Sequence, residues 1–379
     1  MTSISKAGFI YAFYGNLLVY TIWYECYFNE EELVSRHVWN KGIVMHSGFL
    51  MDTESNRRNT LKQTKQAALI ALQHYDIDWS SIHFIQISEH ATFRVDFGDG
   101  EKLLLRIHPA TKTRSETASE LEWLAYLRHK ELIVPVAISN HEGEFITNAE
   151  SREGLRYYAT LLKWVEGDTI HKGMLTTENV HRLGAMMARL HEAGADFCPS
   201  RDFVRPTWGS KSFTKDWEHL NGHYAHFISE EGIALYAQAA VRVSNHLDAL
   251  ESQERDDYGM IHADLHIGNI VYHHGEPFPI DFGRCGFGYH LYDIAQSIMG
   301  LHPAQRELFI QGYRKVRQLS EAAMPILESF FIMSIIEAYS FHAENELETE
   351  GLMEEQPYAQ ALLSAYMNGD PFLFQSLAV

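Results

Sequence analysis

Two short segments in the second half of the chain carry the residues best suited to chemistry. Residues 262–269 read HADLHIGN, and residues 281–283 read DFG. The first holds an acidic residue and, five positions later, an asparagine, while the second opens on another acidic residue. Phosphoryl transfer needs one carboxylate to accept a hydrogen bond from the attacking hydroxyl and further oxygen ligands to hold Mg²⁺ against the phosphates. The two segments therefore favour phosphoryl transfer.

The residues around these segments predict how they come together. Residues 269–272 and 277–280 have the composition of short strands and predict a small hairpin that brings the two segments side by side. The plainer interpretation is that Asp264 caps a turn and Asp281 ends a strand, since an isolated D-F-G arises by chance. A D-x-x-x-x-N loop followed by a strand-bounded D-F-G is the protein-kinase arrangement, and this pairing in the right order favours the catalytic interpretation.

The HADLHIGN segment resembles the H-G-D-x-x-x-x-N loop of the aminoglycoside phosphotransferase and choline kinase superfamily, which includes homoserine kinase-like and stress-response kinases. The similarity runs from about residue 82 to about residue 301. It implies that Asp264 orients or deprotonates the acceptor hydroxyl and that Asn269 and Asp281 bind the metal. Asp293 matches a family acidic residue expected to be structural. One departure is Ala263, where the family usually has glycine.

The resemblance also assigns the phosphate side of a nucleotide site. Arg106 ends an apolar strand segment and matches the family position that carries a cation, where a guanidinium can hold phosphate through two donors. Its partner is expected in the next helix, at Glu120, with Glu116 as the alternative. A solvated strand residue is the competing interpretation of Arg106.

Two further segments complete the expected nucleotide site. Residues 88–92, SEHAT, lack the glycine pattern of protein kinases but resemble the family's S-E-N-x-T turn, with histidine replacing asparagine. The likeness assigns Ser88 and Thr92 to the phosphates. The strand ending in WVEG resembles the family hinge and assigns Trp164 and Val165 to the adenine pocket, although core packing explains the tryptophan equally well.

The acceptor side is less specific. An acidic stretch contains Glu337, Glu344, Glu346, Glu348 and Glu350. In the resembling family, acidic residues in this region bind cationic acceptors such as amino sugars or choline. A solvated helix end accounts for the same charges, and we favour that interpretation.

Composition limits the classes of partner and compartment. The 379 residues carry a net charge of −19, which disfavours nucleic acid and anionic membranes. Three cysteines without a C-x-x-C pair fit a reducing cytoplasm, and 22 histidines without an H-E-x-x-H spacing predict no zinc enzyme. Residues 7–24 are uncharged and apolar, so a membrane span, a signal peptide or an extension outside the working domain stay open there.

The elements that must position these residues follow from apolar periodicity. Helices are expected at 56–75, 115–130, 176–192, 232–250, 291–299, 304–318 and 324–342, and strands at 82–87, 91–97, 102–107, 134–138, 144–147 and 157–165, besides the hairpin. Strands followed by helices predict an α+β, bilobal, protein-kinase-like fold with an antiparallel-sheet N-lobe and a mostly helical C-lobe. The expected division is an extension (1–50), an N-lobe (51–165) and a C-lobe (166–379).

These observations predict an enzyme that moves the γ-phosphate of ATP, with Mg²⁺, to a hydroxyl of a small acceptor that could be cationic. The alternatives are a homoserine- or choline-type kinase, a stress-response protein serine/threonine kinase, and a non-catalytic nucleotide-binding module. The choice of acceptor, the preference for ATP or GTP, the role of the first 44 residues and the oligomeric state are not specified by the sequence.

Overall fold

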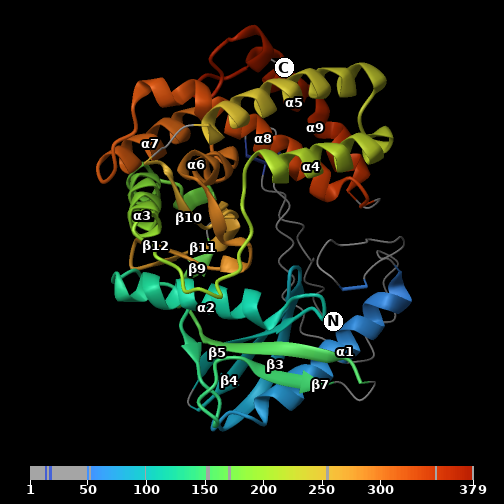
Figure 1. Ribbon diagram of the computed structural model, residues 1–379, viewed down its shortest axis with the longest axis vertical. Helices are drawn as coiled ribbons and strands as arrows, with labels where there is room; N and C mark the ends of the chain where they lie inside the picture. Colours follow the sequence, from blue (N-terminus) through green and yellow to red (C-terminus); the bar gives the residue numbers. More distant parts are fainter. Residues whose placement is uncertain are drawn as a thin grey trace, which may run out of the picture.

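The computed structural model describes residues 13–14, 17–18, 49–50, 53–98, 100–150, 154–169, 172–252, 256–345 and 348–377. The chain forms two stacked lobes, a smaller one built on a sheet and a larger one that is mostly helical (Figure 1). This arrangement confirms the predicted α+β, bilobal, kinase-like fold.

The small lobe is a six-stranded antiparallel sheet in the order β3-β4-β5-β8-β6, with β7 also paired to β8. Helix α1 packs against one face of the sheet, and α2 lies between the sheet and the large lobe (Figure 1). The elements are α1 (Glu54–Leu72), β3 (Trp79–Ile87), β4 (Ala91–Phe97), β5 (Glu101–His108), α2 (Arg114–His129), β6 (Ala137–Ile138), β7 (Thr147–Glu150) and β8 (Arg156–Lys163).

Successive side chains of β5 point alternately into the apolar core under α1 and toward the large lobe. Leu103, Leu105 and Ile107 join the apolar cluster that α1 covers. Because successive side chains point to opposite faces, Arg106 projects toward α2 and the large lobe. Thr92 of β4 lies directly opposite Arg106 and shares that face.

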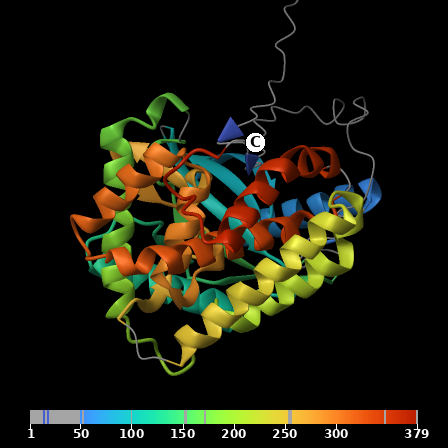
Figure 2. The ribbon, with the colours of Figure 1, turned by 90° about the horizontal axis from the view of Figure 1, so that it is seen from above.

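Among the described residues, the large lobe contains seven α-helices and two small sheets, and the loops of the site connect the strands of these sheets (Figure 1). Its elements are β9 (Asp168–Thr169), α3 (Thr177–Ala195), α4 (Ser210–His223), α5 (Glu230–Glu251), β10 (Tyr258–Ile261), β11 (Ile270–His273), β12 (Glu276–Pro279), β13 (Gly286–Tyr289), α6 (His290–Met299), α7 (Pro303–Arg314), α8 (Met324–His342) and α9 (Thr349–Asn368). Figure 2, viewed from above, shows α4 and α5 side by side along one edge of this lobe.

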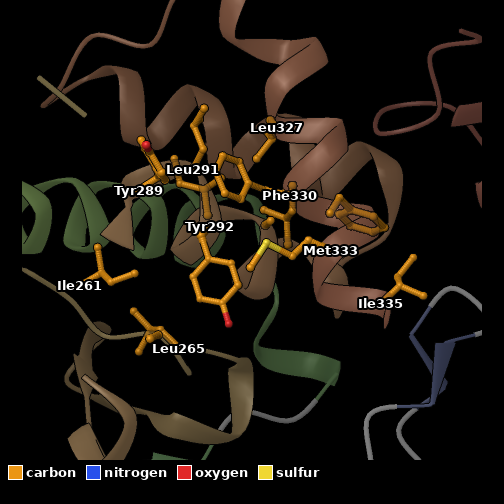
Figure 3. Close-up of a cluster of buried hydrophobic side chains, with 14 of the residues drawn as sticks. Ile261, Leu265, Tyr289, Leu291, Tyr292, Leu327, Phe330, Met333 and Ile335 are labelled. Carbon is orange, nitrogen blue, oxygen red and sulfur yellow. The ribbon is translucent and has the colours of Figure 1, made fainter. Parts of the chain in front are cut away.

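Helix α8 is the centre of the large lobe's core. Phe330 and Met333 on α8 meet Tyr292 on α6 and Leu265 in the loop after β10 (Figure 3). The stretch Glu321–His342 is long and apolar enough to cross a membrane, yet 67% of its most apolar window is buried inside the protein. Core packing therefore accounts for its composition.

Several predicted elements differ from the observed ones. The expected strand at 134–138 shrinks to the two residues of β6, and the one at 144–147 becomes β7 at Thr147–Glu150. Strand β8 ends at Lys163 and α7 ends at Arg314, both earlier than predicted. Helices α4 and α9 were not predicted. The proposed span at 7–24 falls outside the described residues except for β1 (Phe13–Tyr14) and β2 (Leu17–Leu18), which pair with each other.

Candidate active site

The loop between β10 and β11 holds Asp264 in a fixed orientation. Asn269 donates through Nδ2 to the Asp264 carbonyl at 2.8 Å and to its Oδ2 at 3.0 Å. Behind the loop, the buried Asp293 accepts the backbone amides of His262 at 2.9 Å and Ala263 at 2.6 Å. The predicted D-x-x-x-x-N pair is thus a direct contact, and Asp293 holds the backbone that presents it.

Asp264 sits in an environment that favours its neutral form. Desolvation raises its pKa to about 8, against the lowering by Arg284, and the negative charges of Asp281 and Glu89 add to the rise. A carboxyl group of this kind holds a proton near neutral pH and releases it readily when a cation or a basic substrate group approaches.

The departure at Ala263 has a backbone consequence. Ala263 adopts φ +60, in the left-handed region that glycine enters without steric cost. An alanine there costs roughly 1 kcal/mol. Its methyl group is fully buried, and the hydrogen bond from its backbone amide to Asp293 holds the conformation in place.

The D-F-G segment brings the second carboxylate to the same cleft. Asp281, two residues after the end of β12, also has a left-handed backbone, with φ 59 and ψ 68. His262 donates through Nε2 to the carbonyl of Ile280 at 3.0 Å, which ties this segment to the Asp264 loop. A Cβ on Gly283 would lie 2.9 Å from both Glu89 Oε2 and His90 Cε1, so glycine lets the turn of the small lobe close over the segment.

The small lobe contributes a buried ion pair. Arg106 Nη2 lies 2.6 Å from Glu120 Oε1, and both side chains are almost fully buried. Burial alone would raise the pKa of Glu120, but the charges of Arg106 and Arg205 outweigh it and hold that pKa well below its usual range. The alternative partner Glu116 instead closes the capping box of α2 with Thr113. The structure thus pairs Arg106 with Glu120.

His90 connects the ion pair to the D-F-G carboxylate. Its Nε2 lies 3.4 Å from Arg106 Nη1 and 3.3 Å from Asp281 Oδ1. Burial alone would raise the pKa of Asp281, but the hydrogen bond and charge of His90, together with Arg106, hold it well below its usual range. This histidine stands where the resembling family has asparagine, and it bridges the two lobes.

Arg205 is a site residue that no sequence motif indicated. Its side chain is 1% exposed and lies 4.0 Å from Glu120 Oε2. It donates to the carbonyls of Cys285 and Gly283, each at 2.6 Å. Arg205 therefore ties helix α2 to the D-F-G segment, and Lys112 adds a donor 3.4 Å from the Gly283 carbonyl.

The remaining predicted nucleotide residues lie in the small lobe and in its connection to the large lobe. Ser88 begins the turn between β3 and β4, where its amide donates to the His90 carbonyl at 3.1 Å. Thr92 is buried and faces Arg106 across the strands. Trp164 and Val165 follow β8, in the connection that leads to β9 of the large lobe. Lys102 lies 6.0 Å from the centre of the Trp164 ring.

On the other side of Asp264 the structure places a group of acidic and aromatic side chains. Glu337 on α8 is buried and accepts a hydrogen bond from the Tyr292 hydroxyl at 2.8 Å. Desolvation and then the charge of Asp216 on α4 raise the pKa of Glu337 to about 8, against the lowering by Arg284. The Arg284 guanidinium lies 4.4 Å over the Trp208 ring and faces both Asp264 and Glu337. Of the acidic stretch, Glu337 is therefore a buried cleft residue and not part of a solvated helix end.

Taken together, a paired arginine, two cleft carboxylates and an amide lie where the two lobes meet. Kinase-like folds place nucleotide phosphates between such groups, with an aspartate at the acceptor hydroxyl. The fold and the site define an ATP-dependent phosphotransferase that acts on an alcohol group.

The chain belongs to the phosphotransferase enzyme family, whose pattern matches residues 83–326. It is 24% identical over 282 residues to an uncharacterised protein of Synechocystis, a match that covers 73% of this chain and 76% of that one. It is 21% identical over 312 residues to the amicoumacin kinase of Bacillus subtilis, with coverage of 78% and 90%.

Solved structures show the same fold. A microcompartment-associated aminopropanol kinase superposes with a TM-score of 0.69 at 24% identity, covering 84% of this chain and all (100%) of that one. An amicoumacin kinase in complex with AMP-PNP, Ca²⁺ and Ami gives a TM-score of 0.65 at 17% identity, covering 82% of this chain and 94% of that one. These superpositions show the fold that the sequence predicted.

Proposed function

We propose that this enzyme transfers the γ-phosphate of Mg²⁺-ATP to a hydroxyl of a small molecule that also carries an amino group. The observation that carries the amino group is the pair formed by the buried Glu337 and the half-buried Asp216, with Arg284 beside both Glu337 and Asp264. Two carboxyl groups that share desolvation and mutual repulsion gain most when an ammonium group neutralises them. The aminopropanol kinase, whose name states such a substrate, has the same fold.

Asn269 and Asp281 fit a divalent cation. Because Asn269 uses its Nδ2 for Asp264, its Oδ1 is turned toward the opposite side, and the Asp281 side chain keeps 28% of its surface exposed. Oxygen donors of this kind suit Mg²⁺. When bound, Mg²⁺ offsets the charge that develops on the phosphate oxygens. The relative solved with AMP-PNP holds Ca²⁺, which takes the same class of ligand.

The small lobe would hold the nucleotide. Arg106, anchored by Glu120, presents its remaining donors to phosphate oxygens, and Ser88 and Thr92 lie at the turn on the same side. The connection at Trp164 and Val165 would receive the adenine edge. Fixing the charged groups before the nucleotide arrives removes the cost of arranging them during the reaction.

Asp264 then acts on the acceptor. Its carboxylate accepts the hydrogen bond of the attacking hydroxyl and aligns the oxygen with the γ-phosphorus, and Asn269 keeps the carboxylate in that orientation. We also place the reaction in the cytoplasm. The free thiols of Cys198 and Cys285 support a reducing compartment.

The test is a matched acceptor screen that follows ATP consumption. Each amino alcohol is paired with the same skeleton lacking nitrogen, for example 1-amino-2-propanol with 1,2-propanediol, beside aminoglycosides, choline and homoserine. We expect phosphorylation of amino-bearing acceptors only, and none with Asp264→Asn. Equal rates for both members of a pair would overturn the amino-group assignment. A labelled protein band from lysate would favour a protein kinase instead.

A further inference from the structure

Helices α4 and α8 run in parallel with matched register. Asp216 on α4 faces Glu337 on α8. One turn on, His219 approaches Ser340, and one turn further His223 approaches Glu344. The interface therefore continues from the cleft pair to a separate polar group, about two turns away, that the phosphotransfer site does not use.

This group gathers three metal-binding atoms. His223 Nε2 lies 3.0 Å from Glu344 Oε1, and His219 Nε2 lies 3.8 Å from the same oxygen. All three ligand atoms fall within 4.8 Å of one another. Tetrahedral coordination at about 2.0–2.1 Å spaces ligand atoms roughly 3.3 Å apart, so the observed distances to Glu344 bracket the value required.

Second contacts fix which ring nitrogen faces the group. His219 Nδ1 lies 3.1 Å from the Ser340 carbonyl, and His223 Nδ1 lies 2.8 Å from the His219 carbonyl. Because a carbonyl only accepts, each Nδ1 carries a proton, so Nε2 is the nitrogen that can offer a lone pair to a metal ion beside Glu344 when the ring is neutral. Backbone carbonyls orient histidine ligands in this way at metal centres.

We propose that His219, His223 and Glu344 bind one zinc-class divalent ion between α4 and the residues that follow α8, with the fourth position left for water. Two imidazoles and one carboxylate suit Zn²⁺, whereas Mg²⁺ prefers the all-oxygen donors Asn269 and Asp281. The two sites therefore select different ions. Side-chain exposures of 19%, 41% and 33% leave a path for the ion to enter.

The ion would link α4 to the C-terminal end of α8, two segments that lie far apart in the sequence and otherwise meet through side-chain contacts. His219 and Ser340 are 121 residues apart in sequence. An ion that binds only the folded state stabilises it by a free energy that rises with the logarithm of the ion concentration relative to Kd. The site is structural, and its occupancy does not depend on which acceptor the enzyme uses.

The experiment is a titration of the metal-free full-length protein with Zn²⁺ and with Co²⁺ as a visible probe. We expect one tight site per chain, a Co²⁺ spectrum of low coordination number and a higher melting temperature with Zn²⁺. His223→Ala and Glu344→Gln should each weaken binding by about 100-fold or more, since loss of even an outer contact costs about 10–100-fold.

The matched control is His129→Ala, which removes an exposed histidine on α2 and should leave binding unchanged. Both test residues are partly exposed, so the variants should fold, and circular dichroism checks this. Binding that survives in both variants, or falls equally in His129→Ala, would overturn the proposal. So would the absence of a stoichiometric Zn²⁺ site in the unmodified chain.

Discussion

Carboxyl groups on the proposed nucleotide side and on the proposed acceptor side of the site have pKa values shifted in opposite directions. On the nucleotide side, Glu120 and Asp281 lie beside Arg106, Arg205 and His90, and their pKa values fall well below the usual range despite burial. On the acceptor side, desolvation and like charges raise the pKa values of Asp264 and Glu337 to about 8.

The pKa shifts separate carboxyl groups that are ionised without a ligand from carboxyl groups that keep their protons until a ligand binds. The nucleotide side has its charges paired before the nucleotide arrives, which favours a preorganised phosphate site. The acceptor side holds protons until an ammonium group or a metal ion makes the ionised form favourable. On the proposed function, binding of such a ligand would therefore lower the pKa values of Asp264 and Glu337.

The largest expected effect is at the centre of the comparison. Asp264→Asn keeps the shape and the contact with Asn269 but cannot accept the hydroxyl proton, so the transfer rate should fall by about 10²–10⁴-fold. Steady-state kinetics with an accepted amino alcohol measures the change. The Kd for ATP should stay within a few-fold of wild type, and a rate near wild type would refute the role of Asp264.

Disrupting the Arg106–Glu120 ion pair on the proposed nucleotide side should lower both the stability and the activity of the enzyme. Glu120→Gln leaves Arg106 buried without its anion, and the free energy of unfolding should fall by about 3 kcal/mol. The KM for ATP should rise at the same time because the guanidinium is no longer fixed. Urea denaturation measures the first effect, with the exposed Glu142→Gln as the control. A change below about 0.5 kcal/mol, typical of a surface site, would contradict the pairing.

A conservative substitution on the proposed acceptor side should have a smaller effect, confined to the KM for the acceptor. Glu337→Gln retains a group of similar shape but removes the charge, so KM for an amino-bearing acceptor should rise about 10–100-fold while KM for ATP stays constant. An equal rise in both KM values would show that the residue acts on the fold and not on the acceptor.

The halves should also differ in pH dependence. The folded-state pKa values of Asp264 and Glu337 are raised, so the folded, ligand-free chain keeps protons that the unfolded chain loses above about pH 4. Stability from these groups therefore falls as pH rises toward about 8. The lowered pKa values of Glu120 and Asp281 act in the opposite sense and cost stability below about pH 4. Melting temperatures from pH 6 to 9 should fall less steeply in Glu337→Gln than in wild type.

The smallest effect is expected at Ala263. Glycine removes strain of roughly 1 kcal/mol at φ +60 but also removes a buried methyl worth about 0.8 kcal/mol. Ala263→Gly should therefore change the free energy of unfolding by less than about 1 kcal/mol and leave the transfer rate intact. Thermal denaturation tests this balance, and a loss above about 2 kcal/mol would mean that the methyl packing dominates.

The sequence predicted the parts of the molecule whose pattern is local. Strand β4 and helix α8 have the predicted bounds because strict alternation and a long apolar run identify them. The pairing of Arg106 with Glu120 followed from a family likeness, and the structure brings the two together.

What escaped prediction depends on distant contacts. Helix α4 buries only Phe213 and Leu220, so its apolar period is too weak to indicate a helix. Arg205 lies in an irregular segment and acquires its place only when α2 and the D-F-G segment meet. Whether a charge such as Glu337 lies in the core or in solvent is likewise decided by packing against α4 and α6, which the sequence of α8 does not contain.

The alternation along β5 makes the active site a check on folding. A slip of one residue in the register between β4 and β5 would turn Arg106 into the apolar core under α1 and turn Leu105 toward the large lobe. Such a chain would bury an unpaired cation and could not compete with the correct register. The guanidinium that we propose for phosphate binding therefore also disfavours the wrong register, before any nucleotide is present.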